Sequence, residues 1–175
     1  MPMPHQLNIE PHFPLNRHAV HQSMSDYEFT MSLSVRHPSV EPGEISRALN
    51  IEPLHSWKVG DPRRGVTDEV IDGTYRETFW TAPLMPKPEL ASDGVSVESV
   101  VLRTLSQLRK SFEFFTDLSR LGGVAELQIS IFGREDFRLE FLPESLGLLG
   151  RLGLMISLHV TPHPYSVDPD ISIAS

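Results

Sequence analysis

Residues 96–132 read SVESVVLRTLSQLRKSFEFFTDLSRLGGVAELQISIF. In the first part of this stretch apolar side chains recur at steps of three or four, the spacing of one helix face. Ser96 is a typical N-cap residue and Gly122-Gly123 suits a helix end, so we expect one continuous helix up to about Leu121. Strict alternation from residue 124 onward predicts a half-buried strand at 124–132. A long helix followed by such a strand indicates an α+β domain.

Further elements are expected on both sides of this stretch. Two shorter helices are predicted at 42–49, where Asn50 suits a left-handed end, and at 143–153, which Pro143 opens. Asp72-Gly73 is a typical turn pair and predicts a hairpin with a long connection. Alternation or strand-forming composition predicts the remaining strands at residues 27–36, 54–60, 74–82, 137–141 and 154–160.

The resulting order is β-α-β-β-α-β, followed by β-α-β. The first six elements match the split βαβ plan of ferredoxin-like domains. We therefore expect a mainly antiparallel sheet with one long and two short helices on one face, and a βαβ extension of that sheet.

The chain is expected to hold one folded domain, residues 26–161, between two proline-bearing tails. Residues 1–25 form an arm rich in proline and histidine, and residues 162–175 form a second tail. We find no apolar run long enough for a signal peptide or a membrane helix, so a cytoplasmic location is expected.

Composition excludes several classes of function. The 175 residues carry a formal net charge of -8, which argues against nucleic-acid binding. Cysteine is absent, so disulfides, thiolate metal sites and a cysteine nucleophile are excluded. The sequence also lacks a glycine-rich phosphate loop and an HExxH motif, and we expect neither a cofactor nor a metal.

Cationic and aromatic side chains gather in the loop after residue 56 and in the strand that follows it. Guanidinium groups beside aromatic faces suit an anionic ligand or a carboxylate on a protein partner. The alternative is a solvated loop in which the tryptophans only close the sheet edge. The candidate binding residues are Trp57, Lys58, Arg63, Arg64, Tyr75, Arg76 and Trp80.

The outward face of the sheet is unusually free of charge. Solvated sheet faces commonly carry lysine and glutamate, which keep sheets apart. Small polar residues permit close approach, so we expect this face to be covered, most simply by self-association. The residues concerned are Thr30, Ser32, Ser34, Gln128, Ser130, Ser157 and His159.

Histidines offer the chain's main acid–base groups. His37 or His159, with a carboxylate such as Glu28, would suit acid–base chemistry near neutral pH. Metal binding by these two histidines with Glu126 or Glu140 is the other reading, and surface or structural histidines are the simplest one. We therefore assign no catalytic residue and leave open whether the protein is an enzyme.

The segment RHPSVEPGEISRALNIEPLHSWKVGDPR, with GTYRETFW downstream, resembles a bacterial family known only as domain of unknown function number 4279. The resemblance covers roughly residues 27–160. Asn50 departs from the glycine common in the family. Because the family has no established chemistry, no site residues carry over. The matching positions are Arg36, His37, Pro38, Pro42, Glu44, Ile45, Ala48, Leu49, Trp57, Gly60, Tyr75 and Trp80.

The sequence is compatible with two functions. The first is a non-enzymatic binding or protein-interaction module, of the accessory or immunity kind, acting through the Trp57–Arg64 loop, the Tyr75–Trp80 strand and the polar sheet face. The alternative is a small enzyme or ligand sensor with a site between that loop and the sheet, where His37 or His159 would be the acid–base group.

Overall fold

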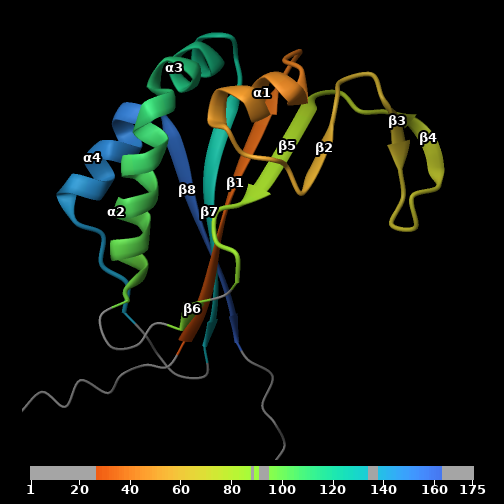
Figure 1. The fold of residues 1–175 in the computed structure, drawn as a ribbon. Helices are drawn as coiled ribbons and strands as arrows, with labels where there is room; N and C mark the ends of the chain where they lie inside the picture. The colour runs from red at the N-terminus through yellow and green to blue at the C-terminus, as the bar shows by residue number, and fades with distance from the viewer. Residues whose placement is uncertain (1–26, 88, 91–94, 134–137, 163–175) are drawn as a thin grey trace, which may run out of the picture.

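The computed structural model describes residues 27–87, 89–90, 95–133 and 138–162. The expected N-terminal arm, and all of the C-terminal tail except Pro162, lie outside these residues. The described chain has two layers, with helices packed on one face of a twisted sheet and the other face left open (Figure 1).

The sheet is mixed. Its neighbouring strands are antiparallel except for β7 and β8, which are parallel. The order across the main path is β2-β5-β1-β7-β8, and β6 pairs with β1 beside that path. The strands are β1 (Tyr27–His37), β2 (His55–Trp57), β5 (Thr78–Pro83), β6 (Glu89–Leu90), β7 (Val124–Gly133) and β8 (Leu154–Pro162).

The alternating apolar residues of β1 and β7 form the centre of the core, as predicted. Every second residue of β1 from Phe29 to Val35 is almost completely buried, and so is every second residue of β7 from Ala125 to Ile131. Trp80 of β5 lies beside Val35 and is fully buried on the same face.

The two short helices lie where the sequence predicts them. These are α1 (Pro42–Leu49) and α4 (Pro143–Leu152), and each has a proline in its first turn. Asn50 ends α1 in the left-handed region with φ 54°, as expected.

The prediction of one continuous long helix is wrong. The chain forms α2 (Val97–Leu108), a 3₁₀ turn η1 (Arg109–Ser111) and α3 (Phe112–Arg120), and α3 turns away from the axis of α2 (Figure 1). The start is as predicted, because Ser96 and Ser99 form a capping box. A tertiary contact that periodicity does not reveal lies at the break: the hydroxyl of Ser111 donates to the carbonyl oxygen of Ala48 in α1 at 2.9 Å.

The strand predicted at 137–141 is absent from the part of it that the structure describes, residues 138–141. Both edges of β7 are already occupied, by β1 on one side and β8 on the other. Leu139 and Phe141 instead pack against the core from an irregular segment, which explains their apolar alternation.

The hairpin predicted from residues 54–60 and 74–82 is present, because β2 pairs with β5. Its long connection contains a second hairpin, formed by β3 (Pro62–Arg64) and β4 (Val70–Thr74). The prediction of a turn at Asp72-Gly73 is wrong, because both residues lie within β4. Gly73 has φ 93° at a point where the register of this hairpin is irregular.

The α+β class is thus confirmed, with a mixed sheet and a separate two-stranded hairpin. The assignment to the ferredoxin-like group stays a prediction.

Candidate functional site

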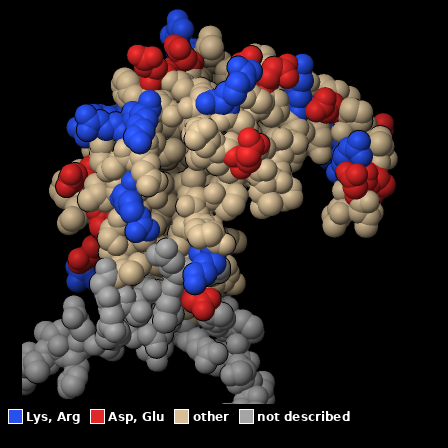
Figure 2. Space-filling view, in the orientation of Figure 1, with Lys and Arg blue, Asp and Glu red and all other residues tan. Residues whose placement is uncertain are grey.

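The β3–β4 hairpin stands out from the β2 side of the sheet and overhangs an open notch (Figures 1 and 2). Its tip carries apolar side chains in contact with solvent. Val66 is fully exposed, and Val70 is 66% exposed. Sequence reasoning missed both valines, although valine beside Gly65 in an otherwise polar loop was a usable signal.

The tip of the hairpin is held by its own hydrogen bonds. The amide of Gly65 donates to the carbonyl oxygen of Glu69 at 2.8 Å, and the amide of Asp68 donates to that of Gly65 at 3.1 Å. The hydroxyl of Thr67 donates to the Glu69 carboxylate, and this bond lowers the pKa of Glu69. These contacts give the tip a defined conformation although it lies in solvent.

An aromatic cluster fixes the base of the hairpin. The ring of Trp57 in β2 stacks against Tyr75 and Phe79, each with ring centroids 4.4 Å apart. The Tyr75 hydroxyl accepts a hydrogen bond from the amide of Arg64 at 3.3 Å. The stack therefore joins β2 and β5 of the main sheet to the first strand of the hairpin.

A recess of about 490 Å³ lies between β2 and the hairpin. Its lining combines aromatic and polar side chains, with both charges represented. The structure thus brings Trp57, Arg64 and Tyr75 of the predicted site together here. The recess is lined by His55, Ser56, Trp57, Asp61, Pro62, Arg64, Gly65 and Tyr75.

Two of the four cations of the predicted site are already engaged. Lys58 pairs with Glu41 at 2.5 Å, and this hydrogen bond raises the pKa of Lys58. Arg64 pairs with Asp68 at 3.1 Å. Arg63 and Arg76 are exposed. Acidic and basic side chains lie side by side on the hairpin (Figure 2), so it is not the cationic patch that the sequence suggested.

Trp80 does not belong to this site. It faces the helices, is fully buried, and donates a hydrogen bond from Nε1 to the Ser46 hydroxyl at 3.0 Å. The cross-strand register pairs Trp80 with Ser56 and Phe79 with Trp57, so the two tryptophans lie on opposite faces of the sheet.

The face with small polar residues is the open face of the sheet, as predicted. Its side chains bond to one another across strands. Ser32 donates to Gln128 at 3.4 Å, Ser34 donates to Glu126 at 3.5 Å, and the Gln128 amide donates to Glu126 at 3.3 Å. Within the described chain no helix covers this face (Figure 1).

The two candidate acid–base histidines lie apart. His37 ends β1 on the helix side of the sheet, whereas His159 lies on the open face, in register with Ser130 and through it with Thr30. Thr30 is seven positions from His37 along β1, which corresponds to about 23 Å. His37 and His159 therefore do not form one site.

His37 has a structural role. It is 5% exposed, and its Nδ1 accepts hydrogen bonds from the amides of Ser39 and Val40 at 3.0 and 2.8 Å. Burial lowers its pKa, against a smaller opposing effect of Glu44. Among the described residues, no group of three or more histidine or acidic side chains is placed to hold a metal ion.

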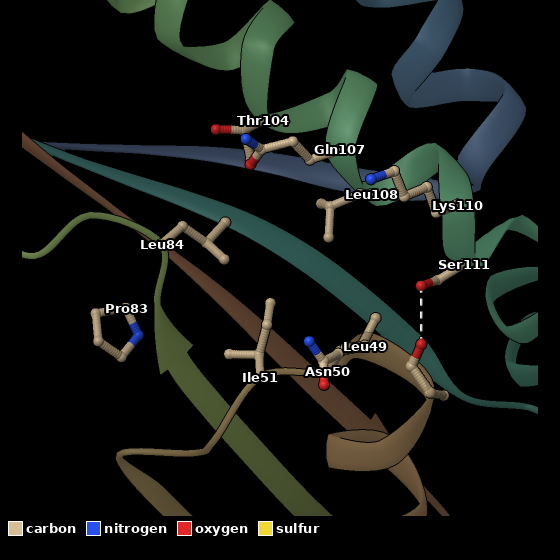
Figure 3. Close-up of a pocket in the computed structure, with 11 residues that line it drawn as sticks. Leu49, Asn50, Ile51, Pro83, Leu84, Thr104, Gln107, Leu108, Lys110 and Ser111 are labelled. Carbon is tan, nitrogen blue, oxygen red and sulfur yellow. Dashed lines mark hydrogen bonds between the residues drawn. The ribbon is translucent and has the colours of Figure 1, made fainter.

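A pocket that sequence reasoning missed lies between α1 and α2 (Figure 3), with a volume of about 560 Å³. Leucine and isoleucine side chains from three separate segments point into it, and Lys110 is the charged residue at its rim. It adjoins the helix break at Ser111. The lining residues are Ala48, Leu49, Asn50, Ile51, Pro83, Leu84, Thr104, Gln107, Leu108, Lys110 and Ser111.

The fold and these surfaces define a small α+β protein with a projecting hairpin and an open polar sheet face. The chain belongs to the family described as domain of unknown function DUF4279, whose model matches residues 27–163. Comparisons with curated proteins and with solved structures gave no match. None of the described helices has the length and apolarity needed to cross a membrane.

Proposed function

We propose that this protein is a non-enzymatic binding module that recognises a protein partner through the β3–β4 hairpin and the recess at its base. The observation that carries the proposal is the combination of an exposed apolar tip, Val66 and Val70, with a firmly anchored base. An anchored element loses little conformational entropy when it binds, and exposed valines at its end gain burial.

The hairpin also limits the chemistry of the partner. Burial of its valines requires an apolar cavity on the partner, and exposed Arg63 and Arg76 favour carboxylates around that cavity. Trp57 and Tyr75, the half-buried aromatic residues that line the recess, would contact the partner around that cavity. Such a contact fits an accessory or immunity-type protein that acts by occupying another protein.

The test is retention of a partner from an extract of the source cells by the immobilised chain, measured by quantitative mass spectrometry. We expect one stoichiometric partner, and we expect Val66→Asp to reduce its recovery about tenfold or more, because a carboxylate would enter an apolar site. The matched control is Val95→Asp, which changes an exposed valine just before α2. Equal recovery by all three proteins would contradict the proposal.

We further propose self-association through the open sheet face. Support comes from its small side chains and internal hydrogen bonds, which let a flat surface approach. Sedimentation should show self-association that Ser32→Lys weakens, since a buried lysine would lack a partner. A wild-type chain that sediments as a monomer would contradict this part.

The pocket between α1 and α2 supports a second candidate, a ligand sensor. An apolar wall beside Lys110 suits a small molecule with an apolar body and one acidic group. Octanoate and phenylacetate are suitable probes: either should raise the melting temperature of the wild type but not of Lys110→Gln, while Arg109→Gln keeps the effect. An unchanged melting temperature with both probes would reject this candidate.

A further inference from the structure

The two edges of the main sheet differ sharply. β2 forms one edge with three residues, between Pro53 and the charged Lys58. Short length, proline and lysine are the usual protections of an edge strand. β8 forms the other edge with nine residues, LMISLHVTP, and contains no acidic residue, lysine or arginine. In the described part of the chain nothing pairs with its outer side.

The exposed side chains of β8 add to this contrast. Leu158 and Val160 are in register with the buried Ile129 and Ile131, so they point to the helix side of the sheet. They nevertheless remain 44% and 51% exposed. A long, uncharged edge strand with apolar side chains at its surface is normally covered by another strand.

We propose that β8 pairs antiparallel with β8 of a second copy around a two-fold axis, joining the two sheets. Each copy carries a net charge of -8, so like-charge repulsion opposes association and is smallest where the surfaces that meet are uncharged. The β8 edge is such a surface, and an antiparallel strand can pair with its own copy. The inference does not depend on the hairpin or on the open sheet face.

The sequence of β8 favours one register. With the axis at His159, Leu158 faces Val160 of the second copy and Ser157 faces Thr161. The apolar pairs then lie on the helix side and the hydroxyl pairs on the open face, and both kinds of pair stabilise antiparallel strands. This register brings together the two most exposed apolar residues on the helix side of β8.

Sedimentation of the full chain with charge variants tests the surface. We expect self-association that Leu158→Lys weakens about tenfold or more, because its lysines would face apolar side chains. Leu54→Lys is the matched control, since Leu54 is 66% exposed beside the β2 edge. Ser32→Lys tests the open face separately. A monomeric wild type, or self-association that Leu158→Lys leaves unchanged, would overturn the proposal. Circular dichroism checks that each variant is folded.

Cross-linking tests the register. Because the natural chain has no cysteine, His159→Cys introduces its one thiol. In the proposed register the two thiols face each other, and mild oxidation should give a covalent dimer, whereas Leu54→Cys should not. Failure of His159→Cys to cross-link above the Leu54→Cys level would overturn the register.

Discussion

His37 keeps its two backbone hydrogen bonds only while its Nδ1 is unprotonated, because both partners are amide donors. The bonds shape the turn between β1 and α1, at residues 38–41. From the sequence, the simplest interpretation of His37 was a surface or structural histidine, with acid–base chemistry and metal binding as the alternatives. The fold uses it as a hydrogen-bond acceptor for two backbone amides, a role that depends on neighbours the sequence does not specify.

This role predicts a pH-dependent stability. The folded-state pKa of His37 lies below its ordinary value of 6.5, so the unfolded chain takes up the proton first as pH falls. The stabilisation is complete above about pH 6.5 and is lost as pH falls from there toward the folded-state pKa. Its loss should lower the free energy of unfolding by on the order of 1 kcal/mol.

Urea unfolding at pH 7.5 and pH 5.5 measures this loss. His37→Asn can still accept from backbone amides and does not titrate, so it should reduce the difference between the two pH values. His55→Asn, a change at an exposed position of β2, should keep the difference. A wild type equally stable at both pH values would show that His37 has no such role.

The two tryptophans show that residue type alone does not decide which face of the sheet a side chain occupies. Trp57 and Trp80 were assigned to one surface because both lie near a cationic loop. Cross-strand register decides their faces, and a shift of one position exchanges them. Trp80 is consequently a core residue, while Trp57 remains at the base of the hairpin.

At the scale of elements, the break between α2 and α3 coincides with a tertiary contact to α1. Its three residues, Arg109–Ser111, include neither proline nor glycine, so periodicity continues through it. Ser111 and its partner Ala48 in α1 are far apart in sequence. The ends of the long helix could therefore be predicted, but its interruption could not.

Removing that contact should have a measurable effect. We expect Ser111→Ala to lower the free energy of unfolding by about 1 kcal/mol, because it removes one hydrogen bond to a helix-end carbonyl. Ser106→Ala is the control, since Ser106 bonds only to its own helix at Leu102. Urea unfolding compares the two, and equal losses would mean that the contact with α1 adds nothing specific.

The β3–β4 hairpin is another element that the sequence did not predict. The sequence predicted that β2 and β5 are joined by a long connection, because both have strand-forming composition. It did not predict the hairpin inside that connection. β3 is only three residues long, and Asp72-Gly73 lies at an irregularity of β4 instead of at a turn.

For the whole molecule, alternation and helical periodicity were enough to predict the α+β class, the buried faces of β1 and β7, and the open polar face. Sites that depend on several distant segments could not be predicted in this way. The pocket between α1 and α2 takes its lining from three such segments. The recess takes its lining from β2, the connection and β3.

Amide hydrogen exchange shows whether the hairpin is the binding element. The full chain would be measured alone and with the partner recovered by the wild type. We expect slower exchange at residues 62–75 and in β2, with no change in α2 and α4, because binding covers the amides of the hairpin. Slower exchange confined to the helices, or no change at the hairpin, would mean that the partner binds elsewhere.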